Sequence, residues 1–299
     1  MRAFVPGIFA RSEALVQATR DLDRGRTAAE AVDEQLERDR RELVAVQEDA
    51  GLDLLSDGLL RWQDLFRPLA EAAEGLSARP LVRFLDTNTF FRAVLVEGKP
   101  RLRRPLPAPE LPKGRWLATL PSPLAFARAT DGALDARTLA AEVLAPQIEA
   151  YAAGGCALIV LSEPFLASGE RSGDLVAALE ELPKVLPLAL WLPFSDASPV
   201  LEKLAEAPVS AVGIDFYLTS LDALPQDYPK EIMAGVIDAR SSRIEDPADI
   251  REFVEQLLPR SSAGVSLTQN GDLQFVSEPI AREKIARLAG ARTPVQEAA

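Results

Sequence analysis

The sequence predicts an α/β protein, a (β/α)8 TIM barrel that carries an inserted β-hairpin. Short apolar runs alternate along the chain with longer stretches that have helical spacing and are rich in Ala, Leu, Glu and Arg. A strand followed by a helix, repeated, is typical of parallel strands joined by crossover helices. Eight apolar runs occur in 299 residues, and a barrel of this kind needs roughly 250 residues. A doubly wound open sheet is the alternative.

Most of the expected strands end at Pro, Ser or Asp, which are common turn residues. The expected helices follow them, with apolar residues at three- and four-residue spacing. The strands are Ala3–Val5, Asp53–Leu55, Trp116–Leu120, Ala157–Leu161, Leu188–Leu192, Ala211–Ile214, Met233–Ile237 and Gly264–Leu267. The helices are residues 28–50, 61–76, 135–153, 171–183, 197–207, 246–258 and 277–289.

Residues 81–107 break this alternation. Polar and apolar residues alternate there, and Glu97-Gly98-Lys99 has the composition of a turn, so the segment predicts a β-hairpin between the second and third barrel units. The proline-rich stretch Pro105–Pro112 is expected to link it back to the barrel. Residues 1–299 are therefore expected to form one barrel, with 81–112 as its inserted hairpin and linker.

Charge and hydropathy exclude several functions. The net charge is −12 and the sequence pI is about 4.7, which argues against nucleic acid, because a nucleic-acid backbone needs a basic face. No run approaches the 18 apolar residues of a membrane-spanning helix. The N-terminal segment has no convincing signal-peptide pattern. We therefore expect a cytoplasmic protein that binds neither nucleic acid nor membrane.

The chain contains no histidine and a single cysteine, Cys156. It therefore lacks the commonest general base, the commonest transition-metal ligand, and every Ser-His or Cys-His nucleophilic arrangement. Cys156 lies at the start of an apolar run, where we expect a buried structural thiol. A zinc site would have to use carboxylates and at most one thiolate.

The C-terminal strand ends of a barrel carry its function, and here they bear a ring of polar residues. The alternative is structural, because strand ends are polar in any barrel and a residue such as Asp57, Asp196 or Asp238 could cap a helix or pair with an ion. The candidate catalytic carboxylates are Glu163, Asp215 and Asp57. The candidate substrate-binding residues are Arg11, Ser162, Arg61, Asp238, Arg240, Arg243 and Asn270.

The segment IVLSEPF, residues 159–165, ends an apolar strand in one acid, Glu163, followed by Pro164. Two interpretations stay open for this carboxylate. It could cap the loop before the next helix or pair with an arginine, or it could face a bound ligand. Its place at a strand end favours the second interpretation.

The ordered motifs EDAGLDLLSDGLLRWQDLF (48–66), TLPSP (119–123), AAGGCALIVLSEPFL (152–166), VSAVGIDFY (209–217) and AGVIDARSSRIEDPADI (234–250) resemble the catalytic barrel of cobalamin-independent methionine synthase. The similarity extends to PGIFARSEALVQATRDLDRG (6–25) and SLTQNGDLQF (266–275), so it covers nearly the whole chain. The sequence also resembles the single-barrel core type of this enzyme, which lacks the N-terminal duplicate of the barrel. The wider superfamily contains uroporphyrinogen decarboxylase and methyltransferases that serve coenzyme M.

The resemblance implies methyl transfer from a methylated folate or a methylcorrinoid to a thiol that zinc activates. Two of the family's zinc-binding positions correspond to Asp215 and Asn270, where the family has Glu and Cys, and the fifth expected strand supplies neither His nor Cys. We therefore expect no family-type zinc site. The family's homocysteine-binding positions correspond to Ile8, Leu59 and Ser162. Because apolar Ile8 and Leu59 cannot hold an ammonium or a carboxylate, homocysteine is not the expected acceptor.

The positions that do match the family are Gly7, Arg11, Asp57, Gly58, Glu163, Pro164, Asp238 and Arg243, while Arg240 stands where the family has a His. The first hypothesis is therefore a zinc-free methyltransferase-like enzyme with another acceptor, an anionic small-molecule ligand, and a folate, a corrinoid or a corrinoid protein as donor. The second is a metal-free decarboxylase-type enzyme, in which Arg11, Arg61, Arg240 and Arg243 surround a polyanion. The third is a non-catalytic ligand-binding or accessory descendant of the barrel.

Overall fold

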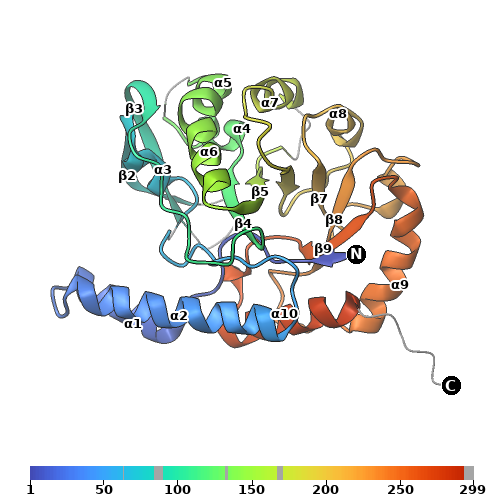
Figure 1. Ribbon diagram of the computed structural model, residues 1–299, viewed down its shortest axis with the longest axis horizontal. Helices are drawn as coiled ribbons and strands as arrows, with labels where there is room; N and C mark the ends of the chain where they lie inside the picture. Colours follow the sequence, from blue (N-terminus) through green and yellow to red (C-terminus); the bar gives the residue numbers. More distant parts are fainter. Residues whose placement is uncertain (63, 84–89, 132–133, 167–170, 293–299) are drawn as a thin grey trace.

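Seven parallel strands form a curled, TIM-barrel-like sheet in this computed structural model, which describes residues 1–62, 64–83, 90–131, 134–166 and 171–292. Helices surround the sheet, as Figure 1 shows. The strand order is β1-β9-β8-β7-β6-β5-β4, with every neighbouring pair parallel. The strands are β1 (Arg2–Ala3), β4 (Trp116–Pro121), β5 (Cys156–Ser162), β6 (Leu188–Leu192), β7 (Ala211–Asp215), β8 (Glu231–Ile237) and β9 (Val265–Gln269).

The segment expected as the second strand, Asp53–Leu55, forms isolated bridges in place of a regular strand. Leu54 bridges Phe4 beyond β1, and Leu55 bridges Trp116 of β4, both in parallel orientation. The amide of Leu117 donates to the carbonyl oxygen of Leu55 at 2.9 Å. Seven of the expected strands are thus regular elements. The remaining expected strand, Asp53–Leu55, contributes only single bridges between the two edges of the sheet. A complete closed eight-stranded barrel is therefore not shown.

Alternate residues of the strands face two different apolar layers. In β5, Leu158 and Val160 belong to an inner cluster, whereas Ile159 and Leu161 pack in the outer layer beneath the helices. This is the two-residue period of a strand that is buried on both faces. The inner cluster draws residues from β4 through β8 and from the segments that contain Phe4 and Leu54, so the sheet curls around it. Its members are Phe4, Leu54, Leu117, Leu158, Val160, Ala189, Trp191, Ala211 and Met233.

Most of the helices lie where the periodicity predicts them. Two were not expected, α1 and α4, and each begins at a serine N-cap: the hydroxyls of Ser12 and Ser122 accept from Leu15 and Ala125, both at 3.0 Å. The α-helices are α1 (Glu13–Asp23), α2 (Ala29–Asp49), α3 (Arg67–Ala72), α4 (Pro123–Arg128), α5 (Ala136–Leu139), α6 (Ala145–Ala153), α7 (Ser172–Leu179), α8 (Leu201–Ala205), α9 (Pro247–Leu257) and α10 (Glu278–Arg292). Within the described residues, no helix is long and apolar enough to cross a membrane.

Four short helical turns also occur within the described residues. The π-helical turn Ala140–Leu144 joins α5 to α6 just before Pro146, which has no N–H to donate to a preceding carbonyl. The 3-10 turns are Leu221–Ala223, Leu258–Arg260 and Leu273–Phe275. Figure 1 shows α1, α2 and α10 along one side of the molecule, where α2 contacts both of the others.

The helix predicted over residues 61–76 is wrong for most of its length. The carboxylate of Asp64 accepts the backbone N–H groups of Phe66 and Arg67, at 2.9 and 2.8 Å, so α3 begins only at Arg67. It ends at Ala72 because Ala73 already pairs with a neighbouring strand. Local helical spacing was thus overridden by a polar turn on one side and by strand pairing on the other.

A hairpin is present, but its strands differ from the prediction. β2 (Ala73–Arg83) pairs antiparallel with β3 (Phe90–Leu102), and the connection falls on residues 84–89, outside the described residues. The turn expected at Glu97-Gly98-Lys99 is wrong, because these residues lie within β3 at a bulge. Opposite them Gly75 has φ +75°, and a Cβ there would lie 2.5 Å from the carbonyl oxygen of Lys99. Glycine allows this close approach of the two strands.

Candidate functional site

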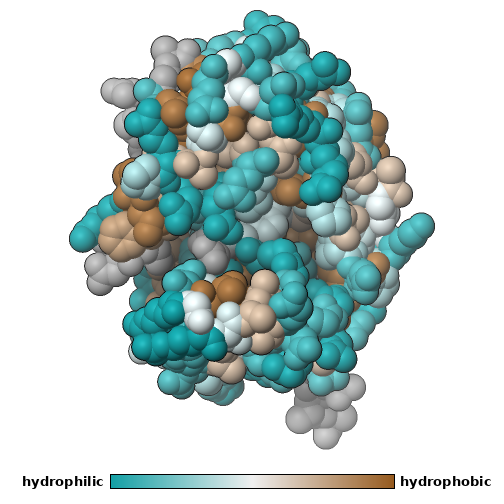
Figure 2. All heavy atoms as spheres, turned by 90° about the vertical axis from the view of Figure 1, so that its left-hand side faces the viewer, coloured by the Kyte–Doolittle hydropathy of each residue, from teal (hydrophilic) through white to brown (hydrophobic). Residues whose placement is uncertain are grey.

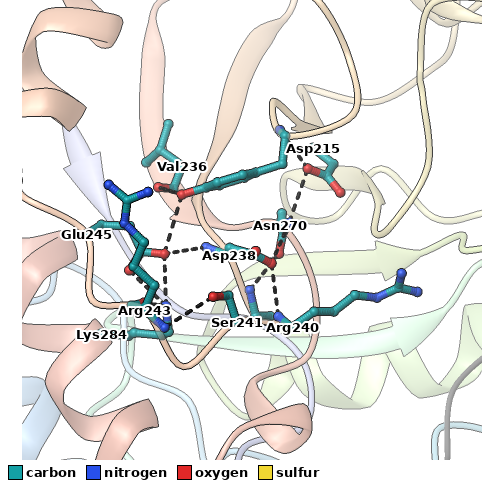
Figure 3. Close-up of polar contacts among 11 residues, drawn as sticks. Asp215, Val236, Asp238, Arg240, Ser241, Arg243, Glu245, Asn270 and Lys284 are labelled. Atoms are coloured by element: carbon teal, nitrogen blue, oxygen red, sulfur yellow. Dashed lines mark hydrogen bonds and ion pairs between the residues drawn. The ribbon is translucent and has the colours of Figure 1, made fainter.

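Asp215 and Asn270 meet at the C-terminal ends of β7 and β9. Nδ2 of Asn270 donates to Oδ1 of Asp215 at 3.2 Å, and the amide of Tyr217 donates to the same oxygen at 2.9 Å. Oδ1 of Asn270 accepts from the amide of Ala239 at 2.8 Å, which fixes the orientation of the side-chain amide. Both side chains are buried. We call this pair the Asp215–Asn270 centre (Figure 3).

The second carboxylate oxygen of Asp215 is the unusual feature of the centre. Oδ2 is buried and has no hydrogen-bond partner among the described residues. Burial raises the pKa of Asp215 to about 6, although hydrogen bonds from Tyr217 and Asn270 oppose the rise. A carboxyl group with this pKa exchanges a proton near neutral pH, and its open oxygen can accept a hydrogen bond from a bound molecule.

A network of polar contacts supports the centre from the side of β8, as Figure 3 shows. Oδ1 of Asp238 lies 3.4 Å from Nδ2 of Asn270, and the amide of Asp238 donates to Glu245 at 2.9 Å. Glu245 is held in turn by Lys284 of α10, whose Nζ lies 2.8 and 2.9 Å from its two oxygens. The Lys284 side chain is fully buried. The ion pair therefore fixes the loop after β8 to α10.

Aromatic side chains lie beside the centre at the end of β6. Phe194 has φ +57°, and its amide donates to the carbonyl oxygen of Asn270 at 3.3 Å. Its ring lies on Gly271, where a Cβ would come within 1.9 Å of the ring. The guanidinium of Arg240 stands over the same ring, 4.3 Å from its centroid, and Phe275 meets it edge-on at 5.1 Å. Phe194 thus carries a cation on its face.

A cavity of about 430 Å³ opens on the outer side of the β7 and β8 ends. Its apolar wall contains Phe216 and Phe253, which meet edge to face at 5.0 Å. Asp238 and Arg243 are the predicted site residues that line it. Five predicted residues, Asp215, Asp238, Arg240, Arg243 and Asn270, therefore lie in one region of the structure.

Glu163 and Ser162 lie at the end of β5 and are buried. The hydroxyl of Ser122 donates to Oε2 of Glu163, and the amide of Phe165 donates to Oε1 at 3.0 Å. Burial raises the pKa of Glu163, with the hydrogen bond from Ser122 opposing it. Since Ser122 also caps α4, Glu163 joins the end of β5 to the start of that helix. Both carboxylate oxygens are occupied by groups of the protein itself.

The remaining predicted residues line other cavities. Asp57 and Arg61 line one of about 860 Å³ between α2, α3 and the proline-rich linker, and Arg61 is exposed and pairs with Asp33 of α2 at 2.7 Å. Burial raises the pKa of Asp57, whose Oδ1 accepts from the amide of Leu59 at 3.0 Å. Arg11 lines a third cavity and donates to the carbonyl oxygen of Leu60. The structure does not bring these three residues to the Asp215–Asn270 centre.

Sequence reasoning missed the supporting residues Glu245, Lys284 and Phe194. One signal was available for Lys284, because it lies on the apolar stripe of α10 with Ala281 and Leu288 at three- and four-residue spacing. A lysine on such a stripe needs a buried anionic partner. For Glu245 and Phe194 no pattern in the sequence points to the contact.

The donor groups present do not fit the zinc site that the resemblance implies. Asp215 and Asn270 bond to each other, and the ring of Phe194 occupies the space next to Gly271. Within the described ranges, no group of three or more His, Cys, Asp or Glu residues could hold a metal ion. Cys156 is buried at the opposite end of β5, where burial raises the pKa of its thiol to about 11. We derive no chemical step through zinc.

The curled parallel sheet defines a fold of TIM-barrel type, and more narrowly the fold of B12-independent methionine synthases. A B12-independent methionine synthase from Shewanella sp. W3-18-1, in complex with selenomethionine, is similar with a TM-score of 0.70 and 17% identity over 89% of each chain. A protein from Listeria monocytogenes, described as a vitamin-B12-independent methionine synthase, has a TM-score of 0.69 and 17% identity over 97% of this chain and 96% of its own. The resemblance predicted from the motifs is thus confirmed at the level of the fold.

No protein-family model matches the sequence, and a search of the curated protein sequences found no match.

Proposed function

We propose that this chain is a methyltransferase-like enzyme on the methionine-synthase fold, one that works without zinc and on an acceptor other than homocysteine. The observation that carries the proposal is the buried, unpartnered Oδ2 of Asp215 at the end of β7. Ligands of barrel enzymes bind at this end of the sheet. The proposal treats the fold as a (β/α)8 barrel whose second strand position is held by residues 53–55.

The geometry supports a role for Asp215 as the base that takes the acceptor's proton. An N–H or O–H group of the acceptor would donate to Oδ2, the open oxygen. As the acceptor atom bonds to the methyl carbon, its proton passes to Asp215, and the bond between the methyl carbon and the donor breaks with its electron pair on the donor. A carboxyl pKa of about 6 suits this transfer near neutral pH. A methylated folate or a methylcorrinoid, free or on a corrinoid protein, would supply the methyl group.

Other residues around the centre have proposed positioning or ligand-binding roles. Asn270 and Asp238 orient the Asp215 carboxylate and the loop after β8. Arg240 and Arg243 would bind an anionic part of the ligand, since guanidinium groups match carboxylates and phosphates in two-point hydrogen bonds. Glu163, with both oxygens occupied by the protein, would hold the β5 end in place and would not touch the ligand.

Calorimetric titration with methyltetrahydrofolate, and separately with methylcobalamin, tests the proposal. We expect micromolar binding of one donor by both the wild type and Asp215→Asn, because Oδ2 is proposed to contact the acceptor. Methyl transfer from that donor to a panel of amines, alcohols and thiols should fall at least about tenfold in Asp215→Asn, because the base is removed. Asp196→Asn is the matched control, since Asp196 is an exposed carboxylate at the end of β6. If the wild type binds neither donor, methyl transfer is wrong.

A second candidate is a non-catalytic ligand-binding descendant of the same barrel. One observation favours it: the homocysteine-type positions Ile8 and Leu59 are buried and apolar, and Leu59 has φ +48°. The two candidates differ in turnover. An enzyme would transfer the methyl group of bound methyltetrahydrofolate to an amine, alcohol or thiol in an acceptor panel. A binding protein would leave the bound methyltetrahydrofolate unchanged. The decarboxylase alternative is not proposed, because Arg11 and Arg61 line cavities other than that of Arg243.

A further inference from the structure

A cavity of about 670 Å³ lies between α1, the β2–β3 hairpin and the segment that leads into α10. Figure 2 looks onto this side of the molecule, and the surface there is hollowed between its upper and lower parts. Three arginines from three separate segments line the cavity: Arg11 after β1, Arg67 at the start of α3, and Arg92 in β3. No member of the Asp215–Asn270 centre or its supporting network lines it.

In the part of the chain that the structure describes, Arg11 and Arg92 form no ion pair, and Arg67 forms only a long one. Arg11 donates to the carbonyl oxygen of Leu60, and Arg92 donates to that of Arg79 at 3.3 Å. Among the described residues, no carboxylate oxygen lies within 4.0 Å of either guanidinium. Arg67 approaches only Glu71, at 3.8 Å, and its Nε is buried with no hydrogen-bond partner among the same residues.

Arg11 is also held in an unfavourable electrostatic setting. Burial, and then the charge of Arg67, lowers the pKa of Arg11, and Asp39 opposes this only in part. A partly buried cation next to another cation is destabilised in the absence of an anion. One carboxylate that lines the cavity, Asp64, is already engaged, because its oxygens accept the backbone N–H groups of Phe66, Arg67 and Arg92 at 2.9, 2.8 and 3.3 Å.

Two more carboxylates line this cavity. Glu278 is paired with Arg282 within α10. Asp23 lies at the C-terminal end of α1 and is exposed. Neither is within ion-pair distance of Arg11, Arg67 or Arg92, so the guanidinium donors stay available to a ligand.

Apolar side chains line the cavity beside Arg92, which pairs with Leu81 across the hairpin. Leu81 of β2 is 58% exposed and Phe90 of β3 is 46% exposed, and both line it with Ile8 and Val276. Large apolar side chains that stay exposed beside a cationic cavity can be covered by a ligand that carries both kinds of surface. An inorganic anion alone would leave them in water.

We propose that this cavity binds an oxyanion, a phosphate or a carboxylate, attached to an apolar body. The guanidinium groups of Arg11, Arg67 and Arg92 bind the oxyanion, because each presents planar N–H donors that match its oxygens. The apolar body lies against Leu81 and Phe90. This site is separate from the Asp215–Asn270 centre and does not depend on the function proposed for it.

Calorimetric titration with phenyl phosphate, benzoate and inorganic phosphate tests the proposal on the full chain. We expect phenyl phosphate or benzoate to bind at least about tenfold more tightly than inorganic phosphate, because only these two carry an apolar body. The tighter of the two identifies the oxyanion. Arg67→Gln and Arg92→Gln should each weaken binding by about tenfold or more, since each removes a charge-assisted hydrogen bond.

Arg20→Gln is the matched control, because Arg20 is exposed on α1, does not line the cavity, and its loss changes the net charge equally. The affinity of Arg20→Gln for the probes should stay within about twofold of the wild-type affinity. Arg92→Gln keeps the test open if Arg67→Gln does not fold, since Arg92 lies in a two-stranded sheet outside the main one. Asp215→Asn should bind the probes normally, which separates this proposal from the previous one.

Two outcomes would overturn the inference. One is the absence of binding by all three probes at concentrations of about 10 mM, well above a typical weak affinity. The other is binding that Arg67→Gln and Arg92→Gln leave within about twofold of the wild type, which would place the probes elsewhere on the surface.

Discussion

Nδ2 of Asn270 donates a hydrogen bond across 3.2 Å to Oδ1 of Asp215, and Oδ2 of the same carboxylate is buried without a partner in the part of the chain that the structure describes. One oxygen is thus fixed by the protein, and the other is left for something else. This asymmetry distinguishes Asp215 from Glu163, both of whose oxygens are engaged. Burial of the Asp215 carboxyl group also raises its pKa to about 6, which leads to the first prediction.

Asp215→Asn should stabilise the unliganded protein at pH 7 but not at pH 4. The folded-state pKa of about 6 lies above the ordinary value of 3.8, so the folded chain binds this proton more tightly than the unfolded chain. The resulting stability is present below pH 3.8 and is lost as the pH rises through about 6. Removing the charge should recover on the order of 1–2 kcal/mol, less than the full shift would give, because the new NH2 group is also buried.

Urea unfolding of the two proteins between pH 4 and pH 7 measures this difference. Burial also raises the pKa values of Asp57 and Glu163, and it raises that of Asp272 to about 6. The wild-type curve alone would therefore mix several groups, and the comparison of the two proteins isolates Asp215. A difference in unfolding free energy that does not change with pH would contradict the assignment.

Lys284→Met should destabilise the protein by about 3–5 kcal/mol, because it leaves the carboxylate of Glu245 buried without its cation. The matched control is Arg287→Met on the same helix, whose side chain and that of its partner Glu283 are 43% and 45% exposed. The free energy of unfolding of Arg287→Met should stay within about 0.5 kcal/mol of the wild-type value. Urea denaturation measures both. Equal losses in the two variants would show that the burial of Lys284 does not matter.

Gly271→Ala should destabilise the site through Phe194. The added Cβ would lie 1.9 Å from the ring, so the ring must leave its place beneath Arg240. We expect a loss of about 1–3 kcal/mol, as for other overpacked sites. The double variant with Phe194→Ala should lose less than the sum of the two single changes, and a double-mutant cycle measures the coupling. Additive losses would mean that Phe194 does not occupy this space.

Glu163→Gln should change stability by less than about 1 kcal/mol, whereas Glu163→Ala should cost about 2–4 kcal/mol. Glutamine can still accept from the amide of Phe165 and donate to the hydroxyl of Ser122, but alanine leaves both groups unpaired. Thermal or urea unfolding compares them. Donor affinity should be the same in Glu163→Gln and the wild type. A loss of affinity of about tenfold in a stable Glu163→Gln variant would instead place this carboxylate against the ligand.

The hairpin and α3 show where local pattern fails. Glycine at position 98 predicted a turn, but it belongs to a bulge in β3 opposite Gly75. The helical spacing of residues 61–76 was real, yet Asp64 holds the start of α3 at Arg67, and pairing with β3 begins at Ala73. In both places a contact between segments distant in the sequence outweighed the local preference, as tertiary context commonly does.

The sequence by itself determined the alternation of strands and helices, and with it the part of the site at neighbouring strand ends. Asp215 ends β7, and Asp238 and Asn270 directly follow β8 and β9. Because these strands are adjacent and parallel, the three residues meet at one edge of the sheet. Periodicity was sufficient because it specifies which residues are buried and where each strand stops.

Only the tertiary structure decided which distant residue each of these groups meets. It paired Lys284 with Glu245, placed Phe194 on Gly271, and directed Asp57 and Arg11 to separate cavities. These contacts depend on the way loops of differing length fold over the sheet and on the volume left between packed side chains. A pattern of a few residues along the chain carries no information on either, because it records the face that a side chain occupies and not the partner across from it.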